Sequence, residues 1–197
     1  MNGFEKRTIA KKQQIIETTF AMMNTDKGIT NVRVDEIAKL AKVGKTTIFK
    51  YFGSKEQLIQ AVFIYFFNLM KDTTKIILDE NQPFEETLIA MSKNKINYLQ
   101  IIHHRFYLDL MEYFTEKDKD GSSPIMKQYI QENSGIMLDL FHRGKKEGKV
   151  DLKYSDEFLL VYFQALIEGI SNPQIYDRIV PYTTQWTEMM IKGLAPK

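Results

Sequence analysis

The sequence predicts an all-α protein of about nine helices. Apolar residues recur at intervals of three and four along most of the chain, as they do on one face of a helix. Proline occurs five times in 197 residues, and no segment alternates apolar and polar residues as a strand would. With 44% hydrophobic and 26% charged residues, the chain is long enough to bury a sizeable core, as one domain or as a small module joined to a larger one.

The N-terminal part predicts one longer helix followed by two short ones. KKQQIIETTFAMM, over 11–23, places its apolar residues on one face of an amphipathic helix of about fifteen residues. Gly28 can end that helix in the left-handed conformation. VDEIAKLAK, over 34–42, carries two acids in its first turn, where the helix dipole favours them. A third helix is expected over 45–51, and Gly53 then breaks the chain.

The later helices are marked by capping residues and prolines. Ser54 and Gln57 form a capping box that opens a long helix, which runs to about Asp79. A charged, glycine-containing loop is expected over 116–123. The segment 105–114 either continues the helix before it or forms a separate short helix. The other helices are expected over 83–103, 124–146, 155–170 (capped by Ser155) and 183–192.

Charge is distributed unevenly along the chain. Residues 1–60 contain eleven Lys or Arg and six Asp or Glu, so their net charge is 11 − 6 = +5. The other 137 residues contain sixteen bases and nineteen acids, so their net charge is 16 − 19 = −3. A basic N-terminal module on a mildly acidic body is typical of a protein whose first module meets a polyanion, although a solvated basic face would give the same count.

The cysteine count and the length of the apolar runs indicate the cellular compartment of the protein. The chain contains no cysteine, which fits a reducing compartment and excludes thiolate chemistry. No apolar leader follows the first residues, and the longest apolar run, AVFIYFFNLM over 61–70, is too short to span a bilayer. We therefore expect a cytoplasmic protein without a membrane partner.

Gly44-Lys45-Thr46 resembles the end of a nucleotide phosphate loop. That loop requires G-x-x-x-x-G-K-[ST] after a buried strand, and the first glycine would fall at Lys39. The preceding residues have the pattern of a helix. A nucleotide site is therefore excluded. If Lys45 binds a phosphate, that phosphate must belong to another kind of ligand.

The spacing of the second and third helices predicts a helix-turn-helix. Ile37 and Ala38 lie on the inner face of the first of these helices, and Val43 fills the turn. Ile48 and Tyr51, three residues apart, pack the next helix back onto it. The outer face then presents groups suited to phosphates and base edges, namely Lys45, Thr46, Thr47, Phe49 and Lys50.

These residues carry a family resemblance. GITNVRVDEIAKLAKVGKTTIFKYFGSKEQLIQAV resembles the DNA-binding domain of the TetR family of bacterial repressors, and the match covers about residues 15–62. Its parts are I-A-x-x-A, then V-x-K-x-T-[LI]-[YF]-x-[YH]-F, then SKE-x-L. The resemblance implies a DNA-binding domain over 1–55 and a ligand-binding and dimerisation domain over 56–197. It implies that the residues of the recognition helix that contact DNA are Lys45, Thr46, Thr47, Lys50 and Tyr51. It also implies that Lys55 contacts a phosphate.

Four positions depart from the family pattern. Residues 32 and 33 are usually Thr or Ser, whose hydroxyls contact a phosphate. Arg33 is expected to replace that contact. Lys42 occupies the turn position at which the family usually has glycine, and its backbone would be strained if its φ is positive. Gly44 caps a helix without a side-chain oxygen. Phe49 lacks the hydroxyl of the usual tyrosine.

The resemblance also implies an internal pocket for a small apolar effector in the larger domain. Methionine and aromatic side chains suit such a lining, although any one of them can equally be plain core. The adjacent His103 and His104 do not face one another on a helix, so a polar contact in the pocket is favoured over a metal site. The predicted pocket residues are Phe66, Met70, His103, Phe106, Tyr107, Met111, Met137 and Phe141.

The last two predicted helices are apolar over more than one face. The family uses this pair as a four-helix dimer seam, and the alternative is that the pair merely closes the core. The predicted seam residues are Phe158, Val161, Tyr162, Ala165, Trp186 and Met190.

The resulting prediction is a homodimeric transcriptional regulator that binds a palindromic operator in double-stranded DNA, most simply a repressor released by a small apolar effector. No catalytic residue, cofactor or metal is expected. Two alternatives stay open. One is a helical protein-interaction module that no longer binds DNA. The other is a small-molecule enzyme, although no paired-carboxylate or triad spacing supports it.

Overall fold

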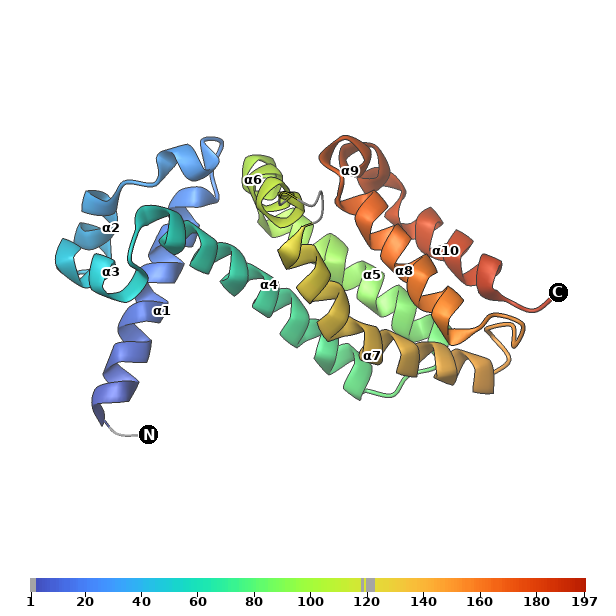
Figure 1. Ribbon diagram of the computed structural model, residues 1–197. Coiled ribbons are helices and arrows are strands. Elements are labelled where there is room, and N and C mark those ends of the chain that lie inside the picture. Colours follow the sequence, from blue (N-terminus) through green and yellow to red (C-terminus); the bar gives the residue numbers. More distant parts are fainter. Residues whose placement is uncertain (1–2, 118, 120–122) are drawn as a thin grey trace. The chain divides into compact units, whose positions relative to one another are not determined.

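The computed structural model describes residues 3–117, 119 and 123–197 (Figure 1). These residues form helices and the turns between them, and the described part contains no strand. The chain divides into two compact units. The N-terminal unit comprises Met1–Asp72 with Ile101–Leu110, and the bundle unit comprises Thr73–Gln100 with Met111–Lys197. The boundary predicted between residues 55 and 56 concerns which part binds DNA, and it stays a prediction.

The N-terminal unit contains a three-helix module. Its elements are α1 (Gly3–Met23), the 3-10 turn η1 (Gly28–Asn31), α2 (Val34–Leu40), α3 (Lys45–Phe52), the first part of α4 (Lys55–Asp79) and the first part of α6 (His104–Thr115). Helix α2 packs against both α1 and α3 (Figure 1). The core of the module consists of fully or almost fully buried Ile15, Met23, Ile37, Ile48 and Leu58.

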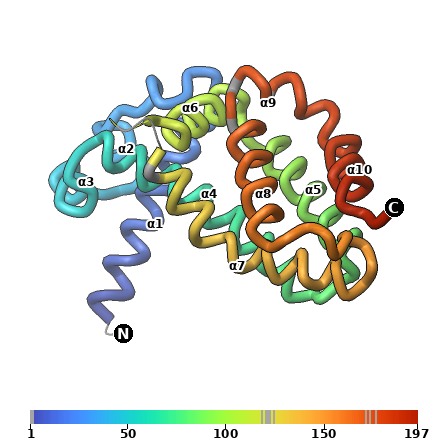
Figure 2. The backbone as a smooth tube through the Cα atoms, turned by 45° about the vertical axis from the view of Figure 1, so that its right-hand side comes forward, coloured from blue at the N-terminus to red at the C-terminus, as the bar shows by residue number. Residues whose placement is uncertain are grey.

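The bundle unit holds the other helices. They are the end of α4, α5 (Phe84–Ile101), the end of α6, α7 (Pro124–Lys146), α8 (Asp156–Ser171), α9 (Pro173–Ile179), the 3-10 turn η2 (Val180–Tyr182) and α10 (Thr183–Leu194) (Figure 2). Helix α8 packs against α7 and α9. The buried cluster of this unit consists of Phe84, Leu88, Met137, Leu140, Phe141, Val150, Leu159 and Leu194.

The predicted all-α class is confirmed, and each expected helix is present. The segment 105–114 belongs to a separate helix, α6, because the chain leaves helical geometry at residues 102 and 103. Helix α1 begins at Gly3, well before the predicted start. A short α9 follows the predicted break at Pro173, because proline is tolerated in the first turn of a helix. The loop predicted over 116–123 lies partly outside the described residues.

Two predicted serine caps are present. Ser54 Oγ accepts a hydrogen bond from Gln57 N at 3.1 Å at the start of α4, and Ser155 Oγ accepts one from Phe158 N at 3.1 Å at the start of α8. Each cap satisfies a backbone N–H that has no partner inside its own helix. None of the helices in the described residues is long and apolar enough to cross a membrane.

Candidate nucleic-acid interface

Buried side chains hold α2 against α3. Ile37 and Ile48 are 0% and 1% exposed, and Val43 N donates a hydrogen bond to Ala38 O at 3.0 Å across the turn. Lys42 adopts a φ of +50°, so this turn does use the left-handed conformation for which glycine is better suited. The predicted helix-turn-helix is therefore present, with Lys42 accepting the strain at its corner.

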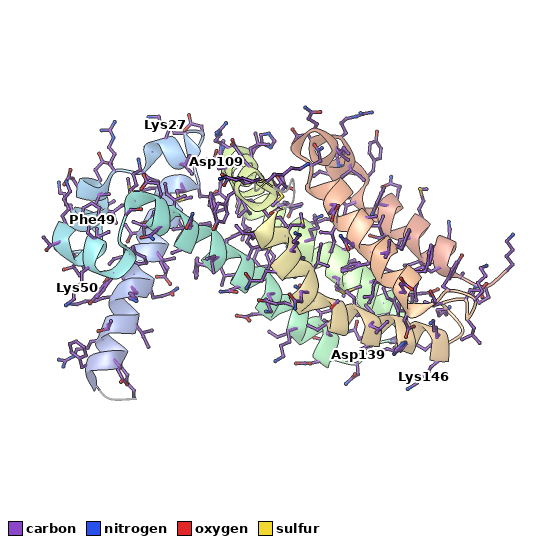
Figure 3. The ribbon with its side chains drawn as sticks, viewed as in Figure 1. Lys27, Phe49, Lys50, Asp109, Asp139 and Lys146 are labelled. Carbon is purple, nitrogen blue, oxygen red and sulfur yellow. The ribbon has the colours of Figure 1, made fainter. Side chains whose placement is uncertain are left out.

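Helix α3 turns its polar face away from this core. Lys45, Thr46 and Lys50 are exposed, and Thr47 and Tyr51 are half-buried. Phe49 is 41% exposed although it is aromatic, and it projects from α3 beside Lys50 (Figure 3). The structure thus brings the predicted recognition residues onto one short helix.

Two of the predicted DNA contacts are paired with acids of α2. Lys45 Nζ lies 2.9 Å from Asp35 Oδ1, and Arg33 Nη1 lies 3.7 Å from Glu36 Oε1. Both pairs are exposed, so each contributes little to stability and can be exchanged at small cost for a phosphate. In the free protein Asp35 thus holds Lys45 of α3, and Glu36 holds Arg33 at the start of α2.

The starts of α3 and α4 offer backbone donors. Gly44 is the N-cap of α3 in an extended conformation and gives no side-chain bond to the first turn. Thr47 N donates to Gly44 O at 2.9 Å, so the N–H groups that can meet an anion are those of Lys45 and Thr46. Lys55 is half-buried in the first turn of α4. Hydrogen bonds from the backbone and from Ser54 lower the pKa of the neighbouring Glu56, which keeps one negative charge in that turn.

Lys12 of α1 also reaches α3. Its Nζ lies 5.6 Å from the centre of the Tyr51 ring, a cation–π distance. Lys12 was not among the predicted DNA contacts. Its spacing of three and seven residues before buried Ile15 and Thr19 was the signal that could have placed it on the side of α1 that faces the module.

The predicted pocket residues lie in two separate groups. Phe66 and Phe106 are buried in the N-terminal unit with ring centres 5.4 Å apart, and Phe20 and Phe63 also pack on Phe106 at 5.1 and 5.7 Å. Tyr107, also buried, and half-buried Met70 belong to this unit.

His103 has an exposed side chain just before α6. Its Nδ1 accepts a hydrogen bond from Arg105 N at 3.2 Å, which caps the start of the helix. Among the described residues, no three His, Asp or Glu side chains are grouped so that they could hold a metal ion. The structure therefore gives His103 a role at a helix terminus.

Three other predicted pocket residues are buried in the bundle unit. Met137 and Phe141 belong to its main apolar cluster, and Met111 is 6% exposed. The same unit contains an open groove of about 350 Å³ that none of the predicted pocket residues lines. Its lining residues are Ile96, Leu99, Gln100, Val180, Pro181, Thr183 and Thr184.

The predicted seam residues leave apolar surface exposed on α8. Phe158 is 49% and Val161 is 59% exposed, and Ala165 is exposed as well. The rings of Tyr154, Phe158 and Tyr162 stack in succession with centres 5.3 and 6.2 Å apart. Burial of the ring raises the pKa of Tyr162.

Helix α10 has apolar surface of the same kind. Met189 is 71% exposed, and Trp186 and Met190 are half-buried. Met190 also packs against the buried cluster of the unit.

Known proteins match this chain in sequence and in fold. Residues 15–62 match the family of bacterial regulatory proteins, tetR family. The uncharacterized HTH-type transcriptional regulator YuxN of Bacillus subtilis (strain 168) is 26% identical over 171 residues, which are 84% of this chain and 53% of YuxN. The chain thus spans about half the length of that relative.

Two solved structures share the fold over nearly the whole chain. A transcriptional regulator from Cytophaga hutchinsonii ATCC 33406 has a TM-score of 0.72 at 18% identity and covers 93% of this chain and 98% of its own. The transcriptional regulator FadR from Bacillus subtilis, solved in complex with stearoyl-CoA, has a TM-score of 0.66 at 17% identity and covers 92% and 98%. The helix-turn-helix geometry and the match over residues 15–62 agree: the chain carries the helix-turn-helix domain of the tetR family of bacterial DNA-binding regulatory proteins.

Proposed function

We propose that the chain is a homodimeric repressor that binds a palindromic operator through α3 and leaves it when a small apolar effector binds. The observation that carries the proposal is the outer face of α3. It presents Lys45, Thr46 and Lys50 to solvent beside an exposed Phe49, on a module whose inner face is buried. Lysines and threonines donate to phosphates, and an aromatic ring or threonine methyl can contact thymine.

The apolar face of α8 and α10 supports the dimer. Large exposed apolar residues mark interaction surfaces. Phe158 and Val161, on neighbouring turns of α8, and Met189 of α10 are each about half exposed or more. A second copy of the chain is the occupant that a two-half-site operator requires, because two recognition helices must dock on one side of the DNA.

The bundle unit is the place we propose for the effector. It supplies methionine and aromatic side chains, which suit a ligand of variable shape. FadR from Bacillus subtilis was solved with stearoyl-CoA, and its likeness to this chain is one of fold. Long-chain acyl compounds are therefore the first effectors to test.

Selection from a pool of random duplexes tests the function. We expect a palindrome whose half-site centres are one helical turn, about 34–36 Å, apart. Lys50→Ala should lose the sequence preference, while Lys146→Ala, an exposed lysine of α7, should keep it (Figure 3). Absence of any salt-dependent duplex binding by the wild-type protein would favour the protein-interaction alternative.

A further inference from the structure

The first three turns of α1 form a basic helical segment that precedes the family match. Residues 3–14 contain Lys6, Arg7, Lys11 and Lys12 and a single acid, Glu5, so their net charge is 4 − 1 = +3. The match to the family begins only at residue 15. All four bases are exposed, and none forms an ion pair with a carboxylate in the described part of the chain.

This segment extends beyond the rest of its unit. In both views the N-terminal turns of α1 project past α2 and α3 (Figures 1 and 2). Phe4 is 69% and Ile9 is 54% exposed, so the side of α1 that carries them is not covered by another helix of the unit. A helix of twelve residues is about 18 Å long, which corresponds to about five base pairs of duplex.

Three of the four bases, Arg7, Lys11 and Lys12, lie on the side of α1 that faces the module, and Lys6 lies on the opposite side. Arg7, Lys11 and buried Ile15 are spaced four residues apart and therefore form one row along the helix. Lys12, three residues before Ile15, contacts the ring of Tyr51 on α3 at 5.6 Å. The row of bases thus begins beside the recognition helix and continues outward from it.

We propose that residues 3–14 are a second DNA-binding element, which contacts backbone phosphates just outside the half-site read by α3. The inference rests on the proposed function, because it assumes that α3 docks on DNA. Continuity with α3 through Lys12 favours a duplex over other anionic partners. The segment contributes affinity without sequence preference, since phosphate contacts carry no base information.

The test compares two triple variants of the full chain that remove the same charge. The first is Lys6→Gln, Arg7→Gln and Lys11→Gln, which leaves Lys12 on Tyr51. The control is Lys75→Gln, Lys93→Gln and Lys146→Gln, three exposed helical lysines of the bundle unit. Binding to a mixed-sequence duplex is measured by fluorescence anisotropy between about 50 and 200 mM KCl.

For the first triple variant, we expect the slope of log affinity against log salt concentration to become shallower by about 2–3 units per bound protomer. The control variant should keep the wild-type slope. A wild-type slope for the first triple variant would overturn the inference and leave the proposed function standing. A wild-type protein that binds no duplex at low salt would overturn both. Loss of binding to phosphatidylglycerol vesicles, with the DNA slope unchanged, would assign the segment to a lipid surface and also overturn the inference. Circular dichroism checks that the variants keep their helix content.

Discussion

The carboxylate of Asp109 packs directly on Gly28, eighty-one residues earlier in the chain. Asp109 Oδ2 accepts a hydrogen bond from the N–H of Ile29 at 2.8 Å, and Oδ1 lies 2.5 Å from Arg105 Nη2. The Asp109 side chain is fully buried, and Gly28 adopts a φ of +54°. A Cβ on Gly28 would overlap both Asp109 Oδ2 and Arg105 Cγ. The start of α6 is thereby attached to the turn that connects α1 and α2.

Gly28→Ala should therefore destabilise the N-terminal unit for two reasons. The positive φ costs an alanine about 1–2 kcal/mol, and overlap with a buried, anchored carboxylate adds about 1–3 kcal/mol. Gly148→Ala is the matched control, because Gly148 has a φ of +70° but open space around its Cβ position. Urea unfolding should show a larger loss of stability for Gly28→Ala. Equal losses in the two variants would mean that the Asp109 contact yields without cost.

Lys55 should act through the DNA backbone. It lies in the first turn of α4, where the serine cap and the helix N-terminus favour an anion. We expect Lys55→Ala to weaken binding to every duplex about equally and to flatten the salt slope by about one unit. Anisotropy titrations on matched and mismatched duplexes measure both quantities. A changed sequence preference with an unchanged slope would show that Lys55 does not contact a phosphate.

Charges placed on α8 should separate the subunits. Tyr162→Lys with Ala165→Lys introduces two cations into the predicted seam, and we expect a monomer of 23.1 kDa that no longer binds the operator. Light scattering after gel filtration measures the mass. Leu152→Lys, at a site 78% exposed outside α8 and α10, is the control and should leave the mass unchanged. Tight operator binding by a demonstrated monomer would contradict the seam.

Lys95 should make the bundle unit more stable as the pH rises. Burial lowers its pKa to about 8, from 10.5 for the ordinary side chain. Below pH 8 both states bind the proton, so the full penalty of this partly buried charge is present. Between pH 8 and 10.5 the unfolded chain binds more protons than the folded one, so stability increases with pH.

Lys95→Met removes this charge and keeps an unbranched side chain. We expect it to stabilise the protein at pH 7 by about 1–3 kcal/mol, and we expect the gain to shrink toward pH 10. Urea unfolding of both proteins at pH 7 and pH 9.5 measures the difference. Lys93→Met, two residues away and exposed, is the control. A gain that is constant over this pH range would mean that Lys95 titrates normally.

The local features of the helix-turn-helix could be predicted because each depends on residues close in sequence. The cap at Ser54 and the strained turn at Lys42 are examples. Long-range relationships left no such signal. Gly28 was expected only to end a helix, and nothing in the sequence indicated that the carboxylate of Asp109 would occupy the space beside it.

The length of α1 was underestimated for a related reason. Its first turns are exposed, so they lack the apolar periodicity that identifies a helix packed on a core. The grouping of the pocket residues also could not be derived from the sequence. A methionine or aromatic residue has the same pattern whether it lines a cavity or, as with Phe66 and Phe106, packs ring against ring.

Binding of effector and operator should be reciprocal. Helix α4 begins at the cap beside Lys55 and runs through residue 72, where the N-terminal unit ends, to Asp79. A ligand that favours one tilt of this helix would change the separation of two recognition helices, and half-sites about 34–36 Å apart tolerate little change.

The ligand acts only through its difference in affinity for the two arrangements, with a usual scale of about 1–3 kcal/mol, or about 5–150-fold. DNA must then weaken the ligand by the same factor. Calorimetry with an identified effector measures its affinity with and without operator. The variant Lys45→Ala with Lys50→Ala, which should not bind operator, must show one affinity in both titrations. One affinity for the wild-type protein as well would exclude this coupling, since a ligand indifferent to bound DNA cannot release it.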